Sequence, residues 1–381
     1  MATAVICEFN PFHNGHKYLL EQISSRVGSE IIAVMSGSFT QRGEAAVCDK
    51  FTRARIAVEN GADLVLELPT VYATAGAHRF ARGGVRIARA FDCVEHLAFG
   101  CEDDDISRLN AAADSENDPA VRARIADLMR GGDYYPRAAQ RAVGEVMGED
   151  IAGILSGANN ILALEYIRAL KNSGISPLPI KRAGARHDSP EADGGFASAS
   201  LIRSRLLNGQ NADAFMPEAP SELCRPELLE RAILALLRRM SLDQLSALPE
   251  IGEGLEHRLF RAIREGESVE AVLSLAKTKR YTRARLRRLL VCAFLGITEE
   301  LQSGEAVYAR VLCMNQRGAA LLKSCRAEVV TSFAKGMKNE ALRPFLGKDA
   351  LASDLLALGF DSPKPCASDY LTKIAPLICA G

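Results

Sequence analysis

Two histidines near the start of the chain have the spacing of a phosphate site. His13 and His16 lie three residues apart in Phe12-His13-Asn14-Gly15-His16, between a short apolar run and a helical pattern. At a helix start this spacing places both imidazoles on one face. The helix N-terminus adds backbone N–H donors, and Gly15 lets a phosphate approach the backbone closely. We therefore predict a polyphosphate cradle, in which both histidines stabilise the charge that develops during attack on an α-phosphate.

A later segment offers further groups for a phosphate. Ser198 and Ser200 stand at the start of a predicted helix that runs to about Leu207, and Arg203 follows within its first turns. Hydroxyl and guanidinium groups suit phosphate oxygens. The alternative for this segment is an ordinary serine cap with a surface arginine, and the alternative for the two histidines is a helix cap without a ligand.

The elements that must hold these residues alternate along the first half of the chain. Apolar runs end at Asn-Pro, Ser-Gly, Pro or Gly, and helical patterns of ten to fifteen residues separate them. The predicted strands are 4–8, 31–35, 63–68, 93–99 and 177–180, and the predicted helices are 15–27, 53–59, 75–90 and 159–172. This order predicts an α/β fold with a parallel sheet and helices on both faces, which binds ligands at the carboxyl ends of its strands.

The remaining chain is expected to be helical. Residues 103–147 are polar and helical in pattern, which indicates an insertion packed on the sheet domain. We predict a nucleotide-binding domain over 1–220 and an all-α domain over 221–381. The helices expected in the second domain are 228–239, 256–265, 268–276, 283–295, 305–313, 317–334 and 349–358.

Composition excludes several classes of protein. The chain has 381 residues, 48% of them hydrophobic, and 47 Lys and Arg against 47 Asp and Glu, which excludes intrinsic disorder and a polyelectrolyte. It has no apolar run of twenty residues and no basic, cleavable leader at its start, so we expect a cytoplasmic protein. The ten cysteines are scattered singly. We expect them to be buried or free thiols, and we expect no metal site built from Cys and His.

Several blocks of sequence resemble one known family. They are EFNPFHNGH (8–16), MSGSFTQRGE (35–44), DKFTRA (49–54), GADLVLELP (61–69), FGCE (99–102), SGANNILALEY (156–166), IKR (180–182) and YTRARL (281–286). In this order they resemble the bacterial tRNA(Met) cytidine acetate ligase family, within the H-x-G-H nucleotidyltransferase superfamily. The resemblance covers about 3–300 and implies a Rossmann-like sheet domain of the HUP type. It also implies that Ser198, Ser200 and Arg203 reach the phosphates from the side opposite the histidines.

The resemblance implies a particular reaction. A member of this family activates acetate with ATP as acetyl-adenylate and transfers the acetyl group to N4 of the wobble cytidine of elongator tRNA(Met). Phe9 stands where the family commonly has tyrosine, which puts a hydroxyl contact there in doubt. The ATP site carries over onto Ile6, Cys7, Glu8, Phe9, Asn10, Pro11, Phe12, His13, Asn14, Gly15, His16, Lys17, Tyr18, Leu19, Gly100, Asn159 and Arg182. We expect Mg²⁺ to accompany ATP, with Glu8 and Asp49 as weak candidate ligands.

A basic segment in the second domain suggests how RNA is bound. Residues 277–288 contain seven Lys and Arg and no acid, and we call them the basic segment. A solvated helix face is the alternative, but the resemblance favours contacts with the tRNA backbone, and Tyr281 is expected to stack on a base or sugar. The predicted tRNA contacts are Lys277, Lys279, Arg280, Arg283, Arg287 and Arg288.

Two other functions remain open. The chain could be an H-x-G-H nucleotidyltransferase or adenylate-forming ligase for a small carboxylate, without RNA, or a non-catalytic tRNA-binding protein. Gln41, Arg42 and Lys50 follow the second strand and are expected either at the ligand edge of the sheet or in a solvated loop. His187 is expected in an exposed turn or closing over substrate, whereas His78, His96 and His257 are taken as structural.

Overall fold

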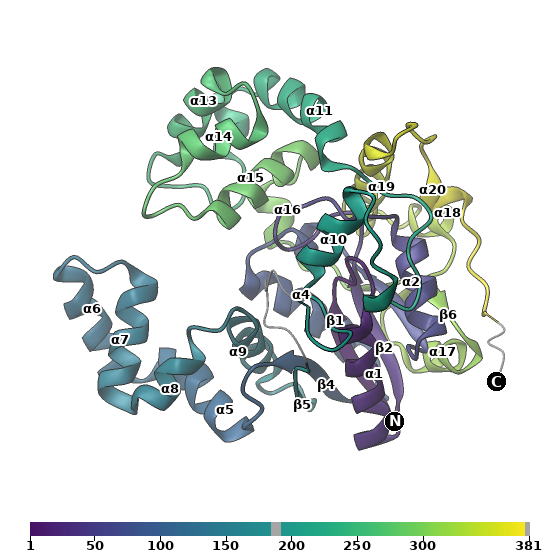
Figure 1. Cartoon of the computed structure of the whole chain (residues 1–381), viewed down its shortest axis with the longest axis horizontal. Helices are drawn as coiled ribbons and strands as arrows, with labels where there is room; N and C mark the ends of the chain where they lie inside the picture. The colour runs from purple at the N-terminus through teal and green to yellow at the C-terminus, as the bar shows by residue number, and fades with distance from the viewer. Residues whose placement is uncertain (184–191, 378–381) are drawn as a thin grey trace.

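The computed structural model describes residues 1–183 and 192–377. Its centre is a seven-stranded sheet in the order β5-β4-β1-β2-β3-β6-β7, in which every neighbouring pair is parallel except β3 and β6. The strands are β1 (Ala2–Cys7), β2 (Glu30–Ser36), β3 (Leu64–Leu68), β4 (Val94–Cys101), β5 (Ser176–Lys181), β6 (Tyr308–Met314) and β7 (Glu328–Val330). The predicted α/β fold with a largely parallel sheet is confirmed (Figure 1).

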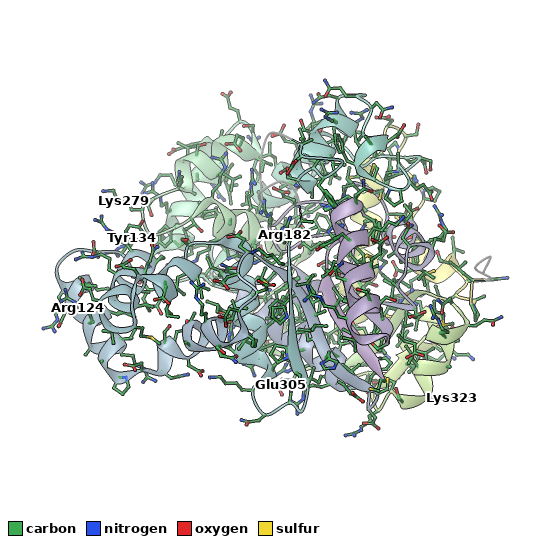
Figure 2. All side chains as sticks on the ribbon, turned by 60° about the horizontal axis from the view of Figure 1, so that its bottom comes forward. Arg124, Tyr134, Arg182, Lys279, Glu305 and Lys323 are labelled. Carbon is green, nitrogen blue, oxygen red and sulfur yellow. The ribbon has the colours of Figure 1, made fainter. Side chains whose placement is uncertain are left out.

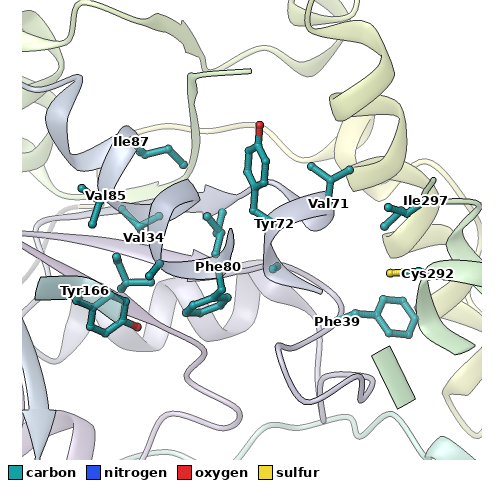
Figure 3. Packing of buried hydrophobic residues seen from close by; sticks show 14 of the residues in the cluster. Val34, Phe39, Val71, Tyr72, Phe80, Val85, Ile87, Tyr166, Cys292 and Ile297 are labelled. Atoms are coloured by element: carbon teal, nitrogen blue, oxygen red, sulfur yellow. The ribbon is translucent and has the colours of Figure 1, made fainter. Parts of the chain in front are cut away.

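Helices cover both faces of this sheet because alternate strand residues point to opposite sides. Along β2, Ile32 and Val34 belong to one hydrophobic cluster, and Ile31 and Ala33 belong to another. The second cluster includes buried residues of α1 (Asn14–Val27) and α2 (Lys50–Glu59). The first includes residues of α3 (Thr70–Ala73), α4 (Ala77–Arg89) and α9 (Ala158–Leu170), and Figure 3 shows Val34 beside Phe80 and Val85 of α4.

The region 103–147, predicted as a helical insertion, contains three α-helices, and a fourth follows it directly. They are α5 (Ile106–Asp114), α6 (Pro119–Arg130), α7 (Tyr135–Met147) and α8 (Glu149–Ile154). Helix α5 contacts α9, whereas α6 and α7 pack on each other and extend away from the sheet (Figure 1). The region therefore differs from the prediction in one respect, since its far end projects from the sheet instead of packing on it.

The chain after residue 198 begins with helices, as predicted. These are α10 (Ala199–Leu207), α11 (Pro226–Arg239), α12 (Leu242–Ser246), α13 (Leu255–Glu265), α14 (Val269–Ala276), α15 (Arg283–Leu295) and α16 (Glu299–Ser303). Helices α11 to α15 form a group beside the sheet (Figure 1). We call α11 to α16 the helical group.

The all-helical prediction for 221–381 fails after this group. The predicted helix 305–313 is wrong, because Tyr308–Met314 forms β6 and pairs antiparallel with β3. All seven residues of β6 are buried, so the segment has no polar alternation, and a short apolar run does not distinguish a strand from a buried helix. The predicted helix 317–334 is likewise divided into α17 (Gln316–Leu321), β7 and α18 (Phe333–Gly336). The chain then forms α19 (Arg343–Leu356) and α20 (Ser368–Leu371).

A buried charged cluster holds this last part of the chain to the sheet. The Lys50 Nζ atom lies 2.7 Å from a Glu67 oxygen and 2.7 Å from a carboxylate oxygen of Asp369 in α20. Arg310 of β6 lies 3.4 Å from the same carboxylate, and all four side chains are at most 1% exposed. Lys50 is therefore a buried structural residue, which excludes the solvated loop, and it does not line the cavity described below.

The cysteines and the helix lengths bear on two expectations drawn from composition, that the cysteines are buried or free and that no segment spans a membrane. Cys48, Cys101, Cys224 and Cys292 are buried free thiols, Cys313 is also buried, and Cys366 is exposed. Within 1–183 and 192–377, no helix is both long and apolar enough to cross a bilayer.

Candidate active site

The loop that leaves β1 fixes both histidines by hydrogen bonds to its own backbone. We call residues 8–16 the histidine loop. His13 is the N-cap of α1, and its Nδ1 accepts the Gly15 backbone N–H at 3.0 Å. The Nδ1 of His16 accepts the His13 backbone N–H at 3.2 Å, and the two rings stack with centroids 3.7 Å apart. Because each Nδ1 is an acceptor, the proton of each neutral imidazole lies on Nε2.

Burial keeps these imidazoles neutral. Burial and the positive charges of Arg182 and Arg203 lower the pKa of His13 from 6.5 to about 3. Burial, His13 and Arg182 lower the pKa of His16 well below its usual value. At neutral pH the two side chains are therefore uncharged Nε2–H donors. The histidines cap α1, which was the alternative to a phosphate site. Capping uses only their Nδ1 atoms, so their Nε2–H groups can also bind a ligand in the cavity.

Gly15 is needed here for a steric reason. A Cβ atom at position 15 would lie 2.9 Å from the His13 Cε1 atom and 3.1 Å from its Nδ1. Any side chain would therefore displace the imidazole that caps the helix. The glycine of the motif protects the histidine geometry in addition to leaving room for a phosphate.

A cavity of about 630 Å³ opens at the carboxyl ends of β1 and β4 and includes most of the predicted ATP residues. The predicted residues that line it are Ile6, Cys7, Glu8, Phe9, Asn10, His13, Gly15, His16, Tyr18, Leu19, Gly100 and Arg182. Gln41 and Arg42 also line it. This agrees with the rule that parallel sheets bind ligands at the carboxyl ends of their strands.

Some predicted ATP residues lie outside this lining. Pro11, Phe12, Asn14 and Lys17 are absent from it. Asn14 instead donates through Nδ2 to the carbonyls of Gly195 at 2.9 Å and Ala214 at 3.0 Å, so it anchors the segments on either side of α10. The Asn159 side chain and the whole of His187 fall outside the described part of the structure.

The three residues predicted as further phosphate contacts, Ser198, Ser200 and Arg203, have different roles. Ser198 is buried and accepts the Leu201 backbone N–H at 3.2 Å, so it is the N-cap of α10. Ser200 and Arg203 line the cavity. The Nη1 atom of Arg203 donates to the carbonyl of Asn10 at 2.9 Å, which ties α10 directly to the histidine loop.

Arg53, which the sequence did not single out as a site residue, supports the cavity from outside its lining. Its guanidinium is fully buried and donates through Nη1 to the carbonyls of Glu8 at 2.7 Å and Ser36 at 3.1 Å. It also donates to the carbonyls of Gly37 and Cys48. Arg53 therefore joins the ends of β1 and β2. The available signal was its place in DKFTRA, where the pattern predicted a helix and Arg53 falls among that helix's buried residues.

The two carboxylates considered for Mg²⁺ have other partners. Asp49 is the N-cap of α2, and its Oδ1 accepts the Thr52 backbone N–H at 2.9 Å. Glu8 lines the cavity, its Oε1 accepts the Gln41 backbone N–H at 2.6 Å, and burial raises the pKa of its carboxyl. Over the described residues, no three His, Cys, Asp or Glu side chains group as ligands for a metal ion.

Arginines of the basic segment form ion pairs with acidic residues from elsewhere in the chain. Arg283 pairs with Glu270, Arg280 with Glu253 at 3.7 Å, and Arg288 with Glu250 at 3.2 Å. Lys277 and Lys279 are exposed, and Lys279 points outward at the edge of the molecule (Figure 2). Arg287 and Arg288 instead line the cavity.

The expectation that Tyr281 stacks on RNA is wrong. Its side chain is only 7% exposed, and its hydroxyl donates to the carbonyl of Glu253 at 3.2 Å. The ring packs inside the helical group and is unavailable to a base. His78, His96 and His257 lie outside the cavity lining in the described structure, and His78 contacts Glu165 at the surface.

This sheet, with paired imidazoles at its first helix, defines a nucleotidyltransferase of the H-x-G-H type. A family model described as HIGH Nucleotidyl Transferase matches residues 1–369. Proteins named tRNA(Met) cytidine acetate ligase from Thermoanaerobacter sp. (strain X514) and Caldanaerobacter subterraneus subsp. tengcongensis are 33% and 34% identical. These matches cover 98% and 99% of this chain and 99% and 100% of those proteins. The chain belongs to the tRNA(Met) cytidine acetate ligase family, which confirms the resemblance of its sequence blocks.

Solved structures agree with this assignment. The crystal structure of Thermotoga maritima TmcAL without ligand matches with a TM-score of 0.87 and 28% identity, over 98% of this chain and 99% of that one. A second structure of the same protein, bound with alpha-thio ATP, matches over the same shares with a TM-score of 0.85.

Proposed function

We propose that this chain is an ATP-dependent ligase that acetylates N4 of the wobble cytidine of elongator tRNA(Met), in the cytoplasm. The observation that carries the proposal is the pair of neutral imidazoles on the histidine loop. Their Nε2–H groups are donors at the end of β1, beside the start of α1, where a nucleotide phosphate is favoured. The names of the full-length relatives supply the substrate pair of acetate and tRNA.

The first chemical step needs positioned donors instead of a base. An acetate oxygen attacks the α-phosphorus of ATP, and pyrophosphate leaves. Because His13 and His16 are neutral, they donate hydrogen bonds to phosphate oxygens and take no proton. Arg182, Ser200 and Arg203 are the proposed phosphate contacts from other elements of the cavity. Free acetate is inert towards an amine, whereas the mixed anhydride has a good leaving group.

In the second step, the exocyclic amine of cytidine forms a bond to the acetyl carbon, the bond from that carbon to the phosphate oxygen of AMP breaks, and the amine nitrogen releases one proton. The wobble base must leave the anticodon stack to reach the cavity, which a loop base does at little cost. Lys277, Lys279, Arg280 and Arg283 are the proposed contacts with the RNA backbone, since they lie in the basic segment outside the cavity lining. We keep as part of this proposal a nucleotide-binding part to residue 220, whose sheet β6 and β7 complete, and an RNA-binding part in the helical group that follows residue 220.

Magnesium is proposed to arrive bound to the phosphates of ATP. The cavity lining contains two carboxylates that could bind the ion, those of Glu8 and Glu44. Glu44 already forms ion pairs with Arg203 and Arg287. When bound, the ion would neutralise phosphate charge. The chain's own residues would then orient the α-phosphate through the histidine loop and hold the other phosphates through arginines.

The test is incorporation of labelled acetate into RNA. Wild-type protein, ATP, labelled acetate and total tRNA should give label at cytidine in elongator tRNA(Met), and His16→Ala should lose it. His257→Ala, an exposed histidine outside the cavity lining, is the matched control and should label normally. Absence of ATP- and acetate-dependent label on RNA would exclude the proposal. Acetate-dependent exchange of pyrophosphate into ATP without RNA labelling would favour a ligase for a small molecule.

A further inference from the structure

We infer that Arg287, which comes from the helical group, binds the pyrophosphate portion of ATP, and that Glu44 positions it. This inference rests on the proposed function and assigns a residue of the same reaction. Arg287 lies on α15 within the basic segment, where the sequence suggested an RNA contact. The structure instead places it in the lining of the nucleotide cavity, together with Arg203 and Ser200.

The carboxylate of Glu44 holds two arginines from distant parts of the chain. Its Oε2 lies 3.3 Å from the Nη2 atom of Arg203, and its Oε1 lies 2.9 Å from the Nη1 atom of Arg287. Arg203 also donates to the carbonyl of Asn10 in the histidine loop. Arg287 is thus connected to the histidine loop through two side chains. Since one carboxylate neutralises a single cation, the trio retains a net positive charge at the cavity.

The backbone fixes the same arrangement. Gly43 has φ +71°, and a Cβ atom there would lie 2.6 Å from the carbonyl carbon of Arg287 and 2.6 Å from the backbone nitrogen of Arg288. The loop that contains Glu44 therefore lies directly on the backbone of α15. Only a glycine permits this approach. The position of Arg287 follows from close packing as well as from its ion pair.

This placement suits the leaving group of the first step. A bond forms between an acetate oxygen and the α-phosphorus, and the bond from the α-phosphorus to the bridging oxygen breaks. The electron pair stays with pyrophosphate, and no proton is transferred. Negative charge therefore grows on the group that leaves. Guanidinium groups bind such oxygens in pairs of hydrogen bonds, and Arg203 and Arg287 are held side by side on one carboxylate to do so.

Binding of ATP and AMP to the full-length protein tests the inference. We expect Arg287→Ala to weaken ATP roughly tenfold or more, because a charge-assisted contact is lost, and to weaken AMP less than about twofold. Arg287→Lys should recover part of the ATP affinity because it keeps the charge. Arg261→Ala, an exposed arginine of α13 outside the lining, is the matched control. Equal losses for ATP and AMP, or no loss for either, would overturn the inference.

Exchange of pyrophosphate into ATP with acetate and without tRNA tests the positioning role. Arg287→Ala should slow this exchange, which a residue that contacts only RNA would leave unchanged. Glu44→Gln should lower its kcat about tenfold while the Kd for ATP changes less than threefold, since the arginines remain but lose their fixed geometry. An unchanged kcat in Glu44→Gln would overturn the positioning role. If wild-type protein shows neither acetate-dependent exchange nor acetate label on RNA, the proposed function fails, and the ATP and AMP comparison still decides the role of Arg287.

Discussion

The histidine loop and the basic segment are both rich in groups that bind phosphate, yet they are held in different ways. In the histidine loop, each imidazole is fixed by a backbone N–H no more than three residues away. In the basic segment, Arg283, Arg280, Arg288 and Arg287 pair with acids on other elements. The geometry of the histidine loop is therefore determined by residues that are close together in the sequence. The geometry of the basic segment depends on acids that approach only in the folded chain. A run of Lys and Arg in the sequence therefore does not indicate which of these side chains face a ligand.

Removing a histidine donor should give the largest effect and separate the two regions most clearly. We expect His16→Ala to lower kcat/KM for acetate-dependent pyrophosphate exchange about 10² to 10³-fold, as when a donor to a developing anion is lost. Single substitutions at the residues of the basic segment that lie outside the cavity lining, Lys277, Lys279, Arg280 and Arg283, should be tolerated far better in this assay. A loss of less than tenfold in His16→Ala would contradict the central role of the histidine loop.

Removal of Arg53, whose guanidinium supports the histidine loop, should have the next largest effect, a loss of folding stability. Arg53→Met leaves the buried carbonyls of Ser36 and Gly37 without their donor, and each such group costs about 1–3 kcal/mol. We expect urea unfolding to show a loss of about 3 kcal/mol, roughly a hundredfold in the unfolding constant. Arg55→Ala is the control, because this arginine of the same helix forms surface ion pairs worth about 0–1 kcal/mol. Equal losses in the two variants would refute the special role of Arg53.

A methyl group at position 15 should sharpen the comparison by disturbing geometry without removing a donor. Because the new Cβ would lie 2.9 Å from His13 Cε1, we expect Gly15→Ala to displace the cap and lower exchange kcat about tenfold, a typical cost of misplacing a catalytic group. Gly153→Ala is a suitable control, since a Cβ there meets no atom within 4 Å. Full activity in Gly15→Ala would show that the tight contact is unimportant.

The exposed end of the basic segment should show a smaller, salt-dependent effect. Loss of one phosphate contact in Lys279→Ala should raise the KM for tRNA roughly fivefold near physiological salt and reduce the salt slope of log K by about one. Acetylation assays over a range of KCl concentrations measure both quantities. A change in kcat with the same salt slope would argue against an RNA contact at Lys279.

The smallest expected effect is the absence of a pH response. Since the pKa of His13 is lowered from 6.5 to about 3, the imidazole stays neutral between pH 6 and 8, and the exchange rate should show no histidine inflection there. The unfolded chain takes up this proton near pH 6.5 whereas the folded chain does not. This contribution to stability is therefore complete above pH 6.5 and is lost as the pH falls toward 3. NMR titration of His13 with a midpoint near 6.5 would contradict this account.

The sequence predicted what depends on short-range spacing. The sheet strands before residue 181, the placement of the two histidines at the start of α1 and the serine cap of α10 follow from motifs of a few residues. It missed β6 because a short, fully buried strand next to β3 has no polar alternation. It also missed Arg53, Glu44 and the burial of Tyr281, since each depends on partners that approach only when distant segments fold together.

The pairing of β6 and Asp369 with the first third of the chain has a consequence for synthesis on the ribosome. Strand β6 is the outer neighbour of β3, and Lys50 forms an ion pair with Asp369 near the end of the described chain. A nascent chain that has exposed only the residues before 308 presents β3 as an open edge and Lys50 and Glu67 without Asp369 and Arg310. The scaffold behind the histidine loop is therefore completed late in translation, and prematurely terminated chains carry an unprotected strand that marks them for aggregation or degradation.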